Sequence, residues 1–160
     1  MPSHPIIRKA LSSDLSSLGQ LGGHLMRAHY AFDSKRFLPP GDDPESGYSW
    51  FLGTQLDQTD VVIFVAELDG EIVGYVFAGL EDLSWKELRG PAGFIHDIVV
   101  SEGTRRLGIA RQLMEAAIEW LRVRGAPRAM LWTATQNEPA QRLFDALGFR
   151  RTMIEMALEL

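Results

Sequence analysis

The feature that most constrains this chain is a basic, glycine-containing run, Arg105-Arg106-Leu107-Gly108-Ile109-Ala110, which separates two apolar segments. The segment before it, Phe94 to Val100, predicts a strand, and the spacing of apolar residues after it predicts a helix ending near Arg124. The first N–H groups of a helix lack partners within the helix and lie at the positive end of its dipole, so they attract anions. Gly108 permits a positive φ or a close backbone approach, and the arginines add charge-assisted contacts. Strand, glycine turn and helix together therefore predict a phosphate-binding backbone.

The remaining apolar patterns indicate an α/β chain with a mixed sheet. Helices are predicted over residues 12–30, 45–56, 109–124 and 138–147, and strands over residues 5–10, 61–68, 71–80, 94–100, 128–135 and 152–160. Asp69-Gly70 is a strong two-residue hairpin signal between two of these strands. The unit from Phe94 to Thr135 is strand–helix–strand, so its two strands are expected to be parallel and joined by a right-handed crossover. No composition shift marks a boundary, and we expect residues 1–160 to form one domain with helices on both faces of the sheet.

Composition excludes several classes of protein. The chain of 160 residues carries a formal net charge of −5, which argues against a general nucleic-acid binder. It has no cysteine, so disulfides, thiolate metal sites and cysteine nucleophiles are excluded. His4, His24 and His29 show no metal-ligand spacing with carboxylates, which predicts no metal site. No apolar stretch approaches about 18 residues and no signal-peptide pattern precedes Asp14, so we expect a cytoplasmic protein without membrane or nucleic-acid partners.

Three motifs relate the predicted phosphate-binding segment to a known protein family. They are Asp97-Ile98-Val99-Val100, then Arg105-x-x-Gly108-x-Ala110, then Asn137-x-x-Ala140-x-x-Leu143-Phe144-x-x-x-Gly148-Phe149. In this order and spacing they resemble the GNAT superfamily of N-acetyltransferases. The resemblance is specific over residues 94–149 and only topological over residues 1–93. It implies a GNAT-like acyl-CoA N-acyltransferase fold, in which about four helices flank a mixed, splayed central β-sheet of about six to seven strands.

The resemblance further implies acetyl-CoA as the co-substrate, held by residues 94–160, while residues 1–93 form the acceptor-side half. Amides from Arg106 to Arg111 would hold the diphosphate, and the backbone of Ile98 to Val100 would pair with the pantetheine arm as an added strand. In the family this strand carries a bulge and diverges from the next strand. An amide from Val99 or Val100 would polarise the thioester carbonyl. The residues so assigned are Ile98, Val99, Val100, Arg105, Arg106, Leu107, Gly108, Ile109, Ala110, Arg111, Asn137 and Phe144.

The implied reaction is direct attack by an amine on the thioester in a ternary complex. Amines with a pKa near 10 are protonated at neutral pH, so a base must first remove a proton. His96 is the first choice, because an ordinary imidazole is mostly neutral at pH 7 and some family members carry histidine or glutamate at this position. His96 is expected on the face of Phe94 and Ile98. Asp97, the second candidate, points to the opposite face unless a bulge resets the alternation.

Structural roles remain open for several of these residues. His96 can instead be hydrogen-bonded under the sheet, Asp97 can contact a helix end, and Asn137 can cap the last helix. Phe144 departs from the family, since many members carry a tyrosine there that protonates the leaving thiolate. Either water or another hydroxyl (Thr133, Thr135 or a tyrosine of the first half) protonates the thiolate instead, or the thiolate leaves unassisted. Because Phe144 has no proton to give, a non-catalytic acyl-CoA-binding or regulatory module remains an alternative function.

The acceptor and the assembly are the least constrained features. The acceptor is expected to be an amine of a small molecule or peptide, bound by the first two helices and the loop between them. An acidic set (Asp33, Asp42, Asp43 and Glu45) is a candidate to attract its ammonium, and an aromatic set (Tyr30, Phe32, Tyr48 and Trp50) is a candidate apolar wall. The alternative is a solvated acidic loop beside ordinary core aromatics. A homodimer is expected from the family, because Thr152–Leu160 alternates regularly and needs a partner.

Overall fold

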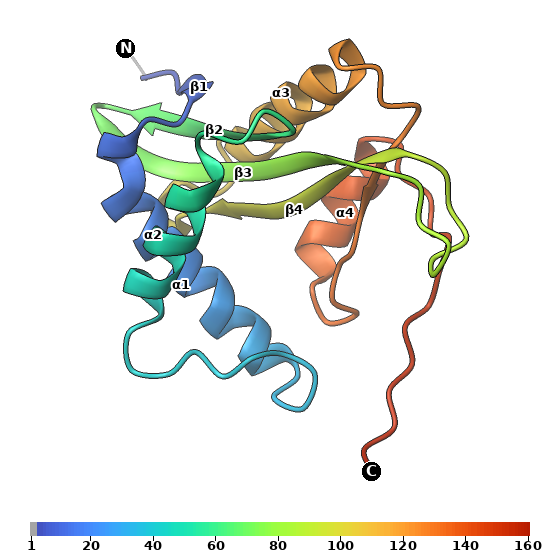
Figure 1. Cartoon of the computed structure of the whole chain (residues 1–160). Coiled ribbons are helices and arrows are strands. Elements are labelled where there is room, and N and C mark those ends of the chain that lie inside the picture. The colour runs from blue at the N-terminus through green and yellow to red at the C-terminus, as the bar shows by residue number, and fades with distance from the viewer. Residues whose placement is uncertain (1–2) are drawn as a thin grey trace.

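The computed structural model describes residues 3–160 and builds them around one five-stranded sheet (Figure 1). The strands follow the order β1-β2-β3-β4-β5, with bounds Ile6–Lys9, Val61–Leu68, Glu71–Glu81, Ala92–Val100 and Ala129–Leu131. The first four pair antiparallel, and β4 and β5 pair in parallel. The predicted mixed sheet and the predicted parallel pair are therefore confirmed. Asp69 and Gly70, with φ angles of 52° and 83°, form the predicted hairpin turn between β2 and β3.

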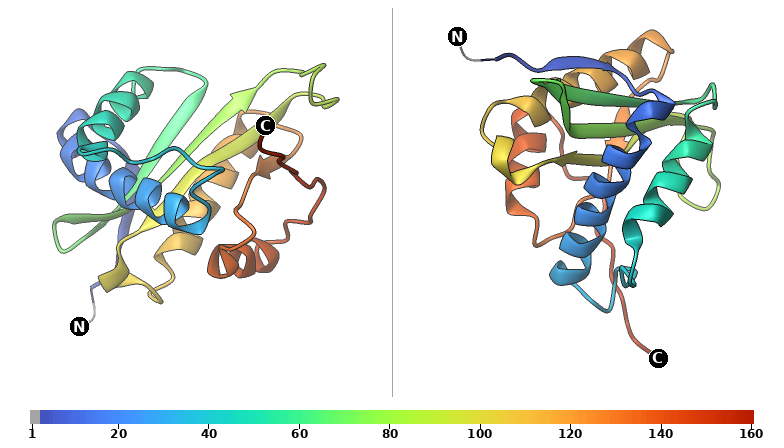
Figure 2. Two further views of the ribbon diagram at one scale, coloured as in Figure 1. Left: turned by 90° about the horizontal axis from the view of Figure 1, so that it is seen from below. Right: turned by 90° about the vertical axis from the view of Figure 1, so that its left-hand side faces the viewer.

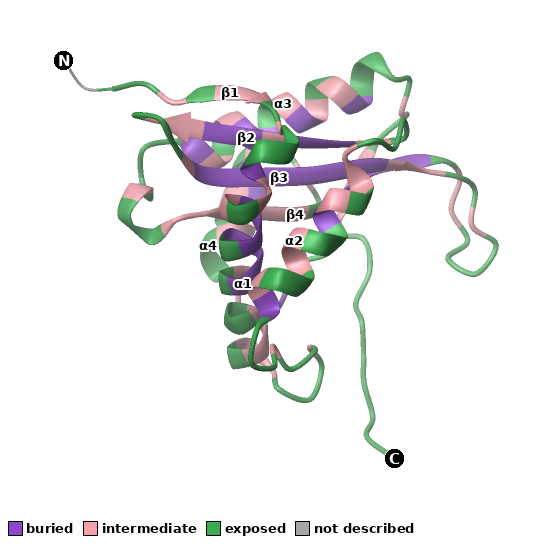
Figure 3. Cartoon of the chain, turned by 60° about the vertical axis from the view of Figure 1, so that its left-hand side comes forward, coloured by how far each residue is buried: buried purple, intermediate pink, exposed green. Residues whose placement is uncertain are grey.

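Two pairs of helices cover the two faces of the sheet (Figure 2). They are α1 (Leu15–Phe32), α2 (Pro44–Gln55), α3 (Ile109–Val123) and α4 (Glu138–Ala146), with short 3₁₀ turns at Ser12–Asp14 and Glu102–Thr104. Helices α1 and α2 pack on one face, and α3 and α4 pack on the other. The alternation of β3 supplies both layers, since Tyr75 and Phe77 face α1 and α2 while Val76 faces α3. Figure 3 shows β3 buried along most of its length.

Close packing between α1 and α2 fixes the position of α2, the helix that carries Tyr48. A Cβ built on Gly22 of α1 would lie 2.2 Å from the Cδ1 atom of Tyr48, a distance that no side chain tolerates. Gly22 therefore lets the two helices approach until the Tyr48 ring covers the α1 backbone. This packing holds Tyr48 against the same face of the sheet as Tyr75 and Phe77.

The sheet has five strands rather than the predicted six to seven, because the strand predicted over residues 152–160 is missing from the described chain, and another predicted strand is shorter than expected. Strand β5 ends at Leu131 rather than Thr135, and residues 152–160 form no strand in the described chain. Residues 151–160 are all exposed and lead away from the sheet (Figure 1). Their alternating pattern satisfies strand periodicity, but a strand also needs a neighbour to pair with, and this segment has none within residues 3–160. An ion pair between Arg36 and Glu155 links it to the rest of the chain.

In the described part of the chain, no helix combines the length and the apolar character needed to span a membrane.

Candidate active site

A bulge in β4 brings the two candidate catalytic residues to one face of the sheet. Phe77 of β3 pairs with Asp97, and the next residue, Ala78, pairs with Ile95, so His96 is the extra residue on β4. The His96 ring lies 4.9 Å from the Phe77 ring, and Asp97 contacts Tyr75 on the same side. The expected bulge is confirmed, and it resets the alternation.

The bulge also corrects one expectation about His96. His96 shares a face with Phe94, whose ring centroid is 6.1 Å away, but not with Ile98. Ile98 packs into the cluster under α3, on the other face of the sheet. A period of two cannot survive an inserted residue, and this is why the predicted common face of His96 and Ile98 is wrong.

The outer edge of β4, which comprises residues His96–Val100, has β3 on one side and no strand of residues 3–160 on the other. The pairs between β4 and β5 run only from Gly93 to Ile95 on β4, after which the two strands diverge as expected. The Ser101 amide donates to the Val73 carbonyl at 2.8 Å, which sets the alternation of the antiparallel ladder. In that alternation the main-chain groups of Ile98 and Val100 face away from β3. They form an edge to which an extended ligand can add as a strand.

The segment that follows this edge is a turn with two left-handed residues. Arg106 has a φ of 70° and Gly108 a φ of 73°, and Gly108 is the N-cap of α3. A positive φ is uncommon for arginine and marks backbone held by its surroundings, so it points to a functional segment. Among residues 3–160 no side chain caps α3, which leaves its first amides available to a ligand.

The side chains of this turn are divided between solvent and core. Arg105 is largely exposed and lies 3.9 Å from Glu102, while Arg111 pairs with Glu115 at 2.9 Å. Leu107 is also exposed, and Ala110 is half-buried at the start of α3. Ile109 is buried, with its side chain in the core under the sheet. The side chains of Arg105 and Arg106 are exposed and can reach an anion at the turn, while Ile109 anchors the helix start.

The last two predicted cofactor residues lie on α4. Asn137 accepts a hydrogen bond from the Ala140 amide at 3.4 Å, so its predicted capping role is confirmed. Phe144 is buried in the α3-side core, and its ring lies 6.0 Å from that of Phe149. The phenylalanine at this position therefore packs as a core residue and brings no hydroxyl to the site.

Asp97 lies among tyrosines on the α1/α2 face. The Tyr75 hydroxyl donates a hydrogen bond to Oδ2 of Asp97 at 3.0 Å. Burial raises the pKa of the Asp97 carboxyl above its ordinary value, and the hydrogen bond from Tyr75 acts in the opposite direction. Burial and the charge of Asp97 likewise raise the pKa values of Tyr48 and Tyr75, so both hydroxyls stay protonated. Asp97 is therefore a carboxylate with strengthened basicity, held by a neutral donor.

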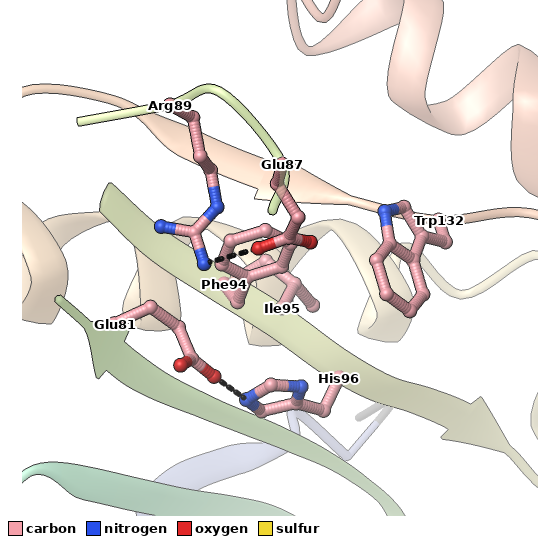
Figure 4. A pocket seen from close by; sticks show the side chains of 7 residues that line it. All are labelled: Glu81, Glu87, Arg89, Phe94, Ile95, His96 and Trp132. Atoms are coloured by element: carbon pink, nitrogen blue, oxygen red, sulfur yellow. Dashed lines mark ion pairs between the residues drawn. The ribbon is translucent and has the colours of Figure 1, made fainter. Parts of the chain in front are cut away.

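A cavity of about 260 Å³ lies beside His96, which we call the β3–β4 cavity (Figure 4). Its lining comprises Glu81, Glu87, Arg89, Phe94, Ile95, His96 and Trp132. Oε1 of Glu81 is 3.6 Å from Nε2 of His96, and Arg89 pairs with Glu87 at 2.8 Å. The Trp132 ring is edge-on to Phe94 at 6.0 Å and is 75% exposed. The cavity thus places carboxylates and aromatic rings next to the candidate base.

The acidic residues expected to bind the acceptor are mostly engaged elsewhere. Asp33 accepts from the amides of Lys35 and Arg36, Asp43 caps α2, and Glu45 pairs with Arg27. The alternative of a structural acidic loop therefore fits these three residues. Among the expected aromatic residues, Tyr48 packs in the core near Asp97 and Trp50 is exposed.

The sequence interpretation missed four residues of the β3–β4 cavity: Glu81, Glu87, Arg89 and Trp132. Three of them belong to the end of β3 and the connection after it, and Trp132 follows β5, so only the tertiary fold brings them together. In the described residues, no group of three or more histidine, aspartate or glutamate side chains is arranged to hold a metal ion.

Several known proteins resemble this chain in sequence and in fold. A sequence model of the acetyltransferase (GNAT) family matches residues 25–149. The chain is 32% identical over 149 residues to an uncharacterized N-acetyltransferase of Archaeoglobus fulgidus, covering 91% of this chain and 92% of that protein. It is 32% identical over 116 residues to an N-alpha-acetyltransferase of Sulfurisphaera tokodaii, covering 69% of this chain and 70% of that protein.

A solved structure extends the likeness to the fold. Aminoglycoside N-acetyltransferase AAC(6′)-Iy in complex with CoA superposes with a TM-score of 0.78 at 22% identity, covering 100% of this chain and 97% of that chain. The family match includes the outer edge of β4, the turn before α3 and the whole of α4. This protein therefore belongs to the GNAT family of acetyltransferases.

Proposed function

We propose that this protein transfers the acetyl group of acetyl-CoA to a primary amine of a small molecule or peptide, by direct attack of the amine in a ternary complex. The observation that carries this proposal is the outer edge of β4, which residues 101–108 connect to a start of α3 that no described side chain caps. The complex of AAC(6′)-Iy with CoA supports acetyl-CoA as the donor. Residues 94–160 would hold the donor, and residues 1–93 would supply most of the acceptor side.

The main chain does most of the donor binding in this proposal. The outward groups of Ile98 and Val100 pair with the amides of the pantetheine arm, as in strand addition. Amides from Arg106 to Arg111 hold the diphosphate at the start of α3, and the exposed Arg105 and Arg106 add charge. The Val100 amide, which faces the open side, is better placed than the Val99 amide to polarise the thioester carbonyl.

His96 is the proposed base. It accepts a proton from the bound ammonium, and Glu81, 3.6 Å away, holds the ring and stabilises the charge that the ring gains. Asp97 remains the second candidate, because the bulge gives it the same face and burial raises its pKa. Substitution of each residue distinguishes the two candidates, because loss of the base lowers kcat and loss of a structural residue lowers stability.

The leaving thiolate has no tyrosine at position 144 to protonate it. The Tyr75 hydroxyl is already donating to the Asp97 carboxylate. We propose that water protonates the thiolate or that it leaves unassisted, which a thiol with an ordinary pKa near 8.5 allows. The burial of Phe144 also favours the alternative, an acyl-CoA-binding module without activity.

Two measurements on the full chain test the proposal. Calorimetry with CoA tests donor binding, and release of free thiol from acetyl-CoA in the presence of primary amines tests transfer. We expect CoA binding and amine-dependent thiol release. Tight CoA binding with no release for any amine would favour the non-catalytic module, and absence of CoA binding would overturn the proposal as a whole.

We also propose that two copies pair through residues 152–160. Apolar residues alternate there and are exposed, including Ile154, Met156 and Leu158. β5 lies at the edge of the sheet with β4 as its one neighbour among the described strands. An exposed alternating segment beside an open sheet edge invites pairing between chains. Light scattering at micromolar concentration is expected to give the mass of a dimer, and a monomer would refute this proposal.

A further inference from the structure

The β3–β4 cavity lies at the place where β4 and β5 stop pairing. The last pair is Ile95 with Leu131, and the next residues, His96 and Trp132, both line the cavity. If the donor occupies the outer edge of β4 and His96 takes the proton, the attacking nitrogen must lie beside His96. The β3–β4 cavity then has to hold the body of the acceptor, and this step rests on the proposed function.

The charges of the β3–β4 cavity leave one carboxylate for a ligand. Arg89 pairs with Glu87 at 2.8 Å and also donates to the carbonyls of Asp82 and Gly90. Among residues 3–160, Glu81 has no arginine or lysine as an ion-pair partner and pairs only with His96. Figure 4 shows the two pairs at opposite walls of the cavity. One carboxylate that no described arginine or lysine neutralises, beside the proposed base, suits a single ammonium group.

A second ammonium would find no partner there. The far wall presents Arg89, whose guanidinium lies 4.8 Å from the Phe94 ring centroid. This cation repels a second positive charge on the ligand, and Glu87 is already neutralised by it. Polyamines and aminoglycosides are therefore poor acceptors for this site.

The remaining walls are flat and apolar. Phe94 is buried against the sheet, and Trp132 stands at the rim with three quarters of its surface exposed. A large indole left uncovered beside a cavity is typical of a binding surface, since its burial by a ligand is favourable. The volume of about 260 Å³ is below the ~300–1,000 Å³ typical of pockets for drug-sized ligands, which favours a small acceptor.

We propose that the acceptor is a small primary amine with one positive charge and a flat apolar body. Its ammonium lies between Glu81 and His96, and its body lies against Phe94 and Trp132. This proposal narrows the acceptor from any small-molecule or peptide amine to a monocationic aromatic or similarly flat amine.

The test uses three probe amines titrated calorimetrically into the full chain, with and without CoA. 2-Phenylethylamine is a flat monocation, butylamine an aliphatic monocation and 1,4-diaminobutane a dication. Because an aromatic pair adds about 0.5–1.5 kcal/mol beyond burial, 2-phenylethylamine is expected to bind about tenfold more tightly than either of the others. Equal affinity for all three amines, or a preference for the dication, would overturn the proposal.

Variants locate the binding site. Trp132→Ala is expected to weaken 2-phenylethylamine about tenfold, and Trp132→Phe is expected to restore most of the loss because a flat ring remains. Glu81→Gln is expected to weaken both monocations by about tenfold, since it removes the charge that pairs with the ammonium. The controls are Trp85→Ala and Asp82→Asn, an exposed tryptophan and an exposed carboxylate on the same connection that do not line the cavity. An unchanged affinity in Trp132→Ala, or an equal loss in Trp85→Ala, contradicts the assignment.

The binding readout separates this inference from the proposed function. If 2-phenylethylamine binds with the expected dependence on Trp132 but no amine releases thiol from acetyl-CoA, the transfer activity is wrong and the acceptor class stands. If thiol is released with another amine while 2-phenylethylamine does not bind, the acceptor class is wrong and the transferase stands.

Discussion

Strand β4 consists of two segments that differ in almost every structural respect. Residues Gly93–Ile95 have partners on both β3 and β5 and are buried, with Ile95 only 4% exposed. Residues Asp97–Val100 pair with β3 alone among the described strands, His96 is the unpaired extra residue, and none of the five is fully buried. The boundary coincides with the bulge at His96.

The difference teaches that side chains and main chain can serve separate purposes in one strand. Ile98 and Val100 still pack their side chains against the α3-side core, as Ile95 does before the bulge. Their main-chain groups, however, face a side where the described chain offers no strand. We infer that the first segment maintains the fold and that the second serves the ligand, and the following changes test this division.

The largest effect is expected at the boundary residue. His96→Ala is expected to lower kcat about 1,000-fold, within the range that a positioned acid or base contributes, and to leave CoA affinity unchanged. His24→Ala removes an exposed histidine of α1 and serves as the control. Steady-state kinetics and CoA calorimetry measure both quantities. A variant with near-normal kcat would remove His96 from the chemistry and break the proposed division at its boundary.

The next effect concerns the first segment. Ile95→Ala is expected to lower the free energy of unfolding by about 3 kcal/mol, because it opens a cavity in the core under α3. Ile98→Ala, in the second segment, removes the same atoms from a half-buried position and is expected to cost less. Urea denaturation compares the two variants, and CoA affinity of the folded Ile95 variant is expected to stay normal. A larger loss for Ile98→Ala would reverse the comparison.

A smaller effect is expected just beyond the second segment. Gly108→Val places a β-branched residue at a φ of 73°, which strains the turn before α3 and is expected to weaken CoA about tenfold. Gly103→Val is a control, because Gly103 lies in the preceding 3₁₀ turn (Glu102–Thr104) in open space without a positive φ. Calorimetry with CoA measures both variants. Similar affinities in the two would show that the backbone conformation at Gly108 does not matter to the donor.

The smallest effect is expected in the pH dependence of stability at Asp97. Because burial raises the pKa of its carboxyl, the folded state holds the proton more firmly than the unfolded state does. The stability of the protein relative to Asp97→Asn is therefore expected to fall as pH rises from the ordinary carboxyl pKa, about 3.9, through the raised value. Urea denaturation of both proteins across this window measures the difference. A stability difference that stays constant across this window, or that increasingly favours the protein with Asp97 as pH rises, would be inconsistent with a raised pKa.

Local signals account for what the sequence predicted correctly. Val61–Leu68 forms a strand with the predicted bounds, and Asp69-Gly70 forms the predicted turn, because both depend on residues adjacent in the chain. Gly108 takes the positive φ that its position before a helix indicated. The capping role of Asn137 was also readable from its place before Pro139 and the apolar face of α4.

What could not be predicted depends on contacts distant in sequence. The alternating pattern of β4 gives no sign of which residue is extra, so the shared face of His96 and Asp97 emerges only from pairing with β3. Residues 152–160 have the alternation of a strand but lack a neighbour in their own chain. Glu81 and Trp132, separated by about 50 residues, meet because β5 aligns with β4. The acidic composition of the loop predicted an acceptor site, yet Asp43 caps α2 and Glu45 pairs with Arg27 of α1.

The central claim is that the main chain of the outer edge of β4 and the start of α3 binds acetyl-CoA. An amide NMR titration of the full chain with CoA tests it most directly. The account predicts that the amides of Ile98, Val100 and Arg106–Arg111 shift, while those of Ala92–Ile95 and of the capped start of α2 do not. Saturating CoA that leaves the amides of Val100 and Gly108 unmoved would contradict it.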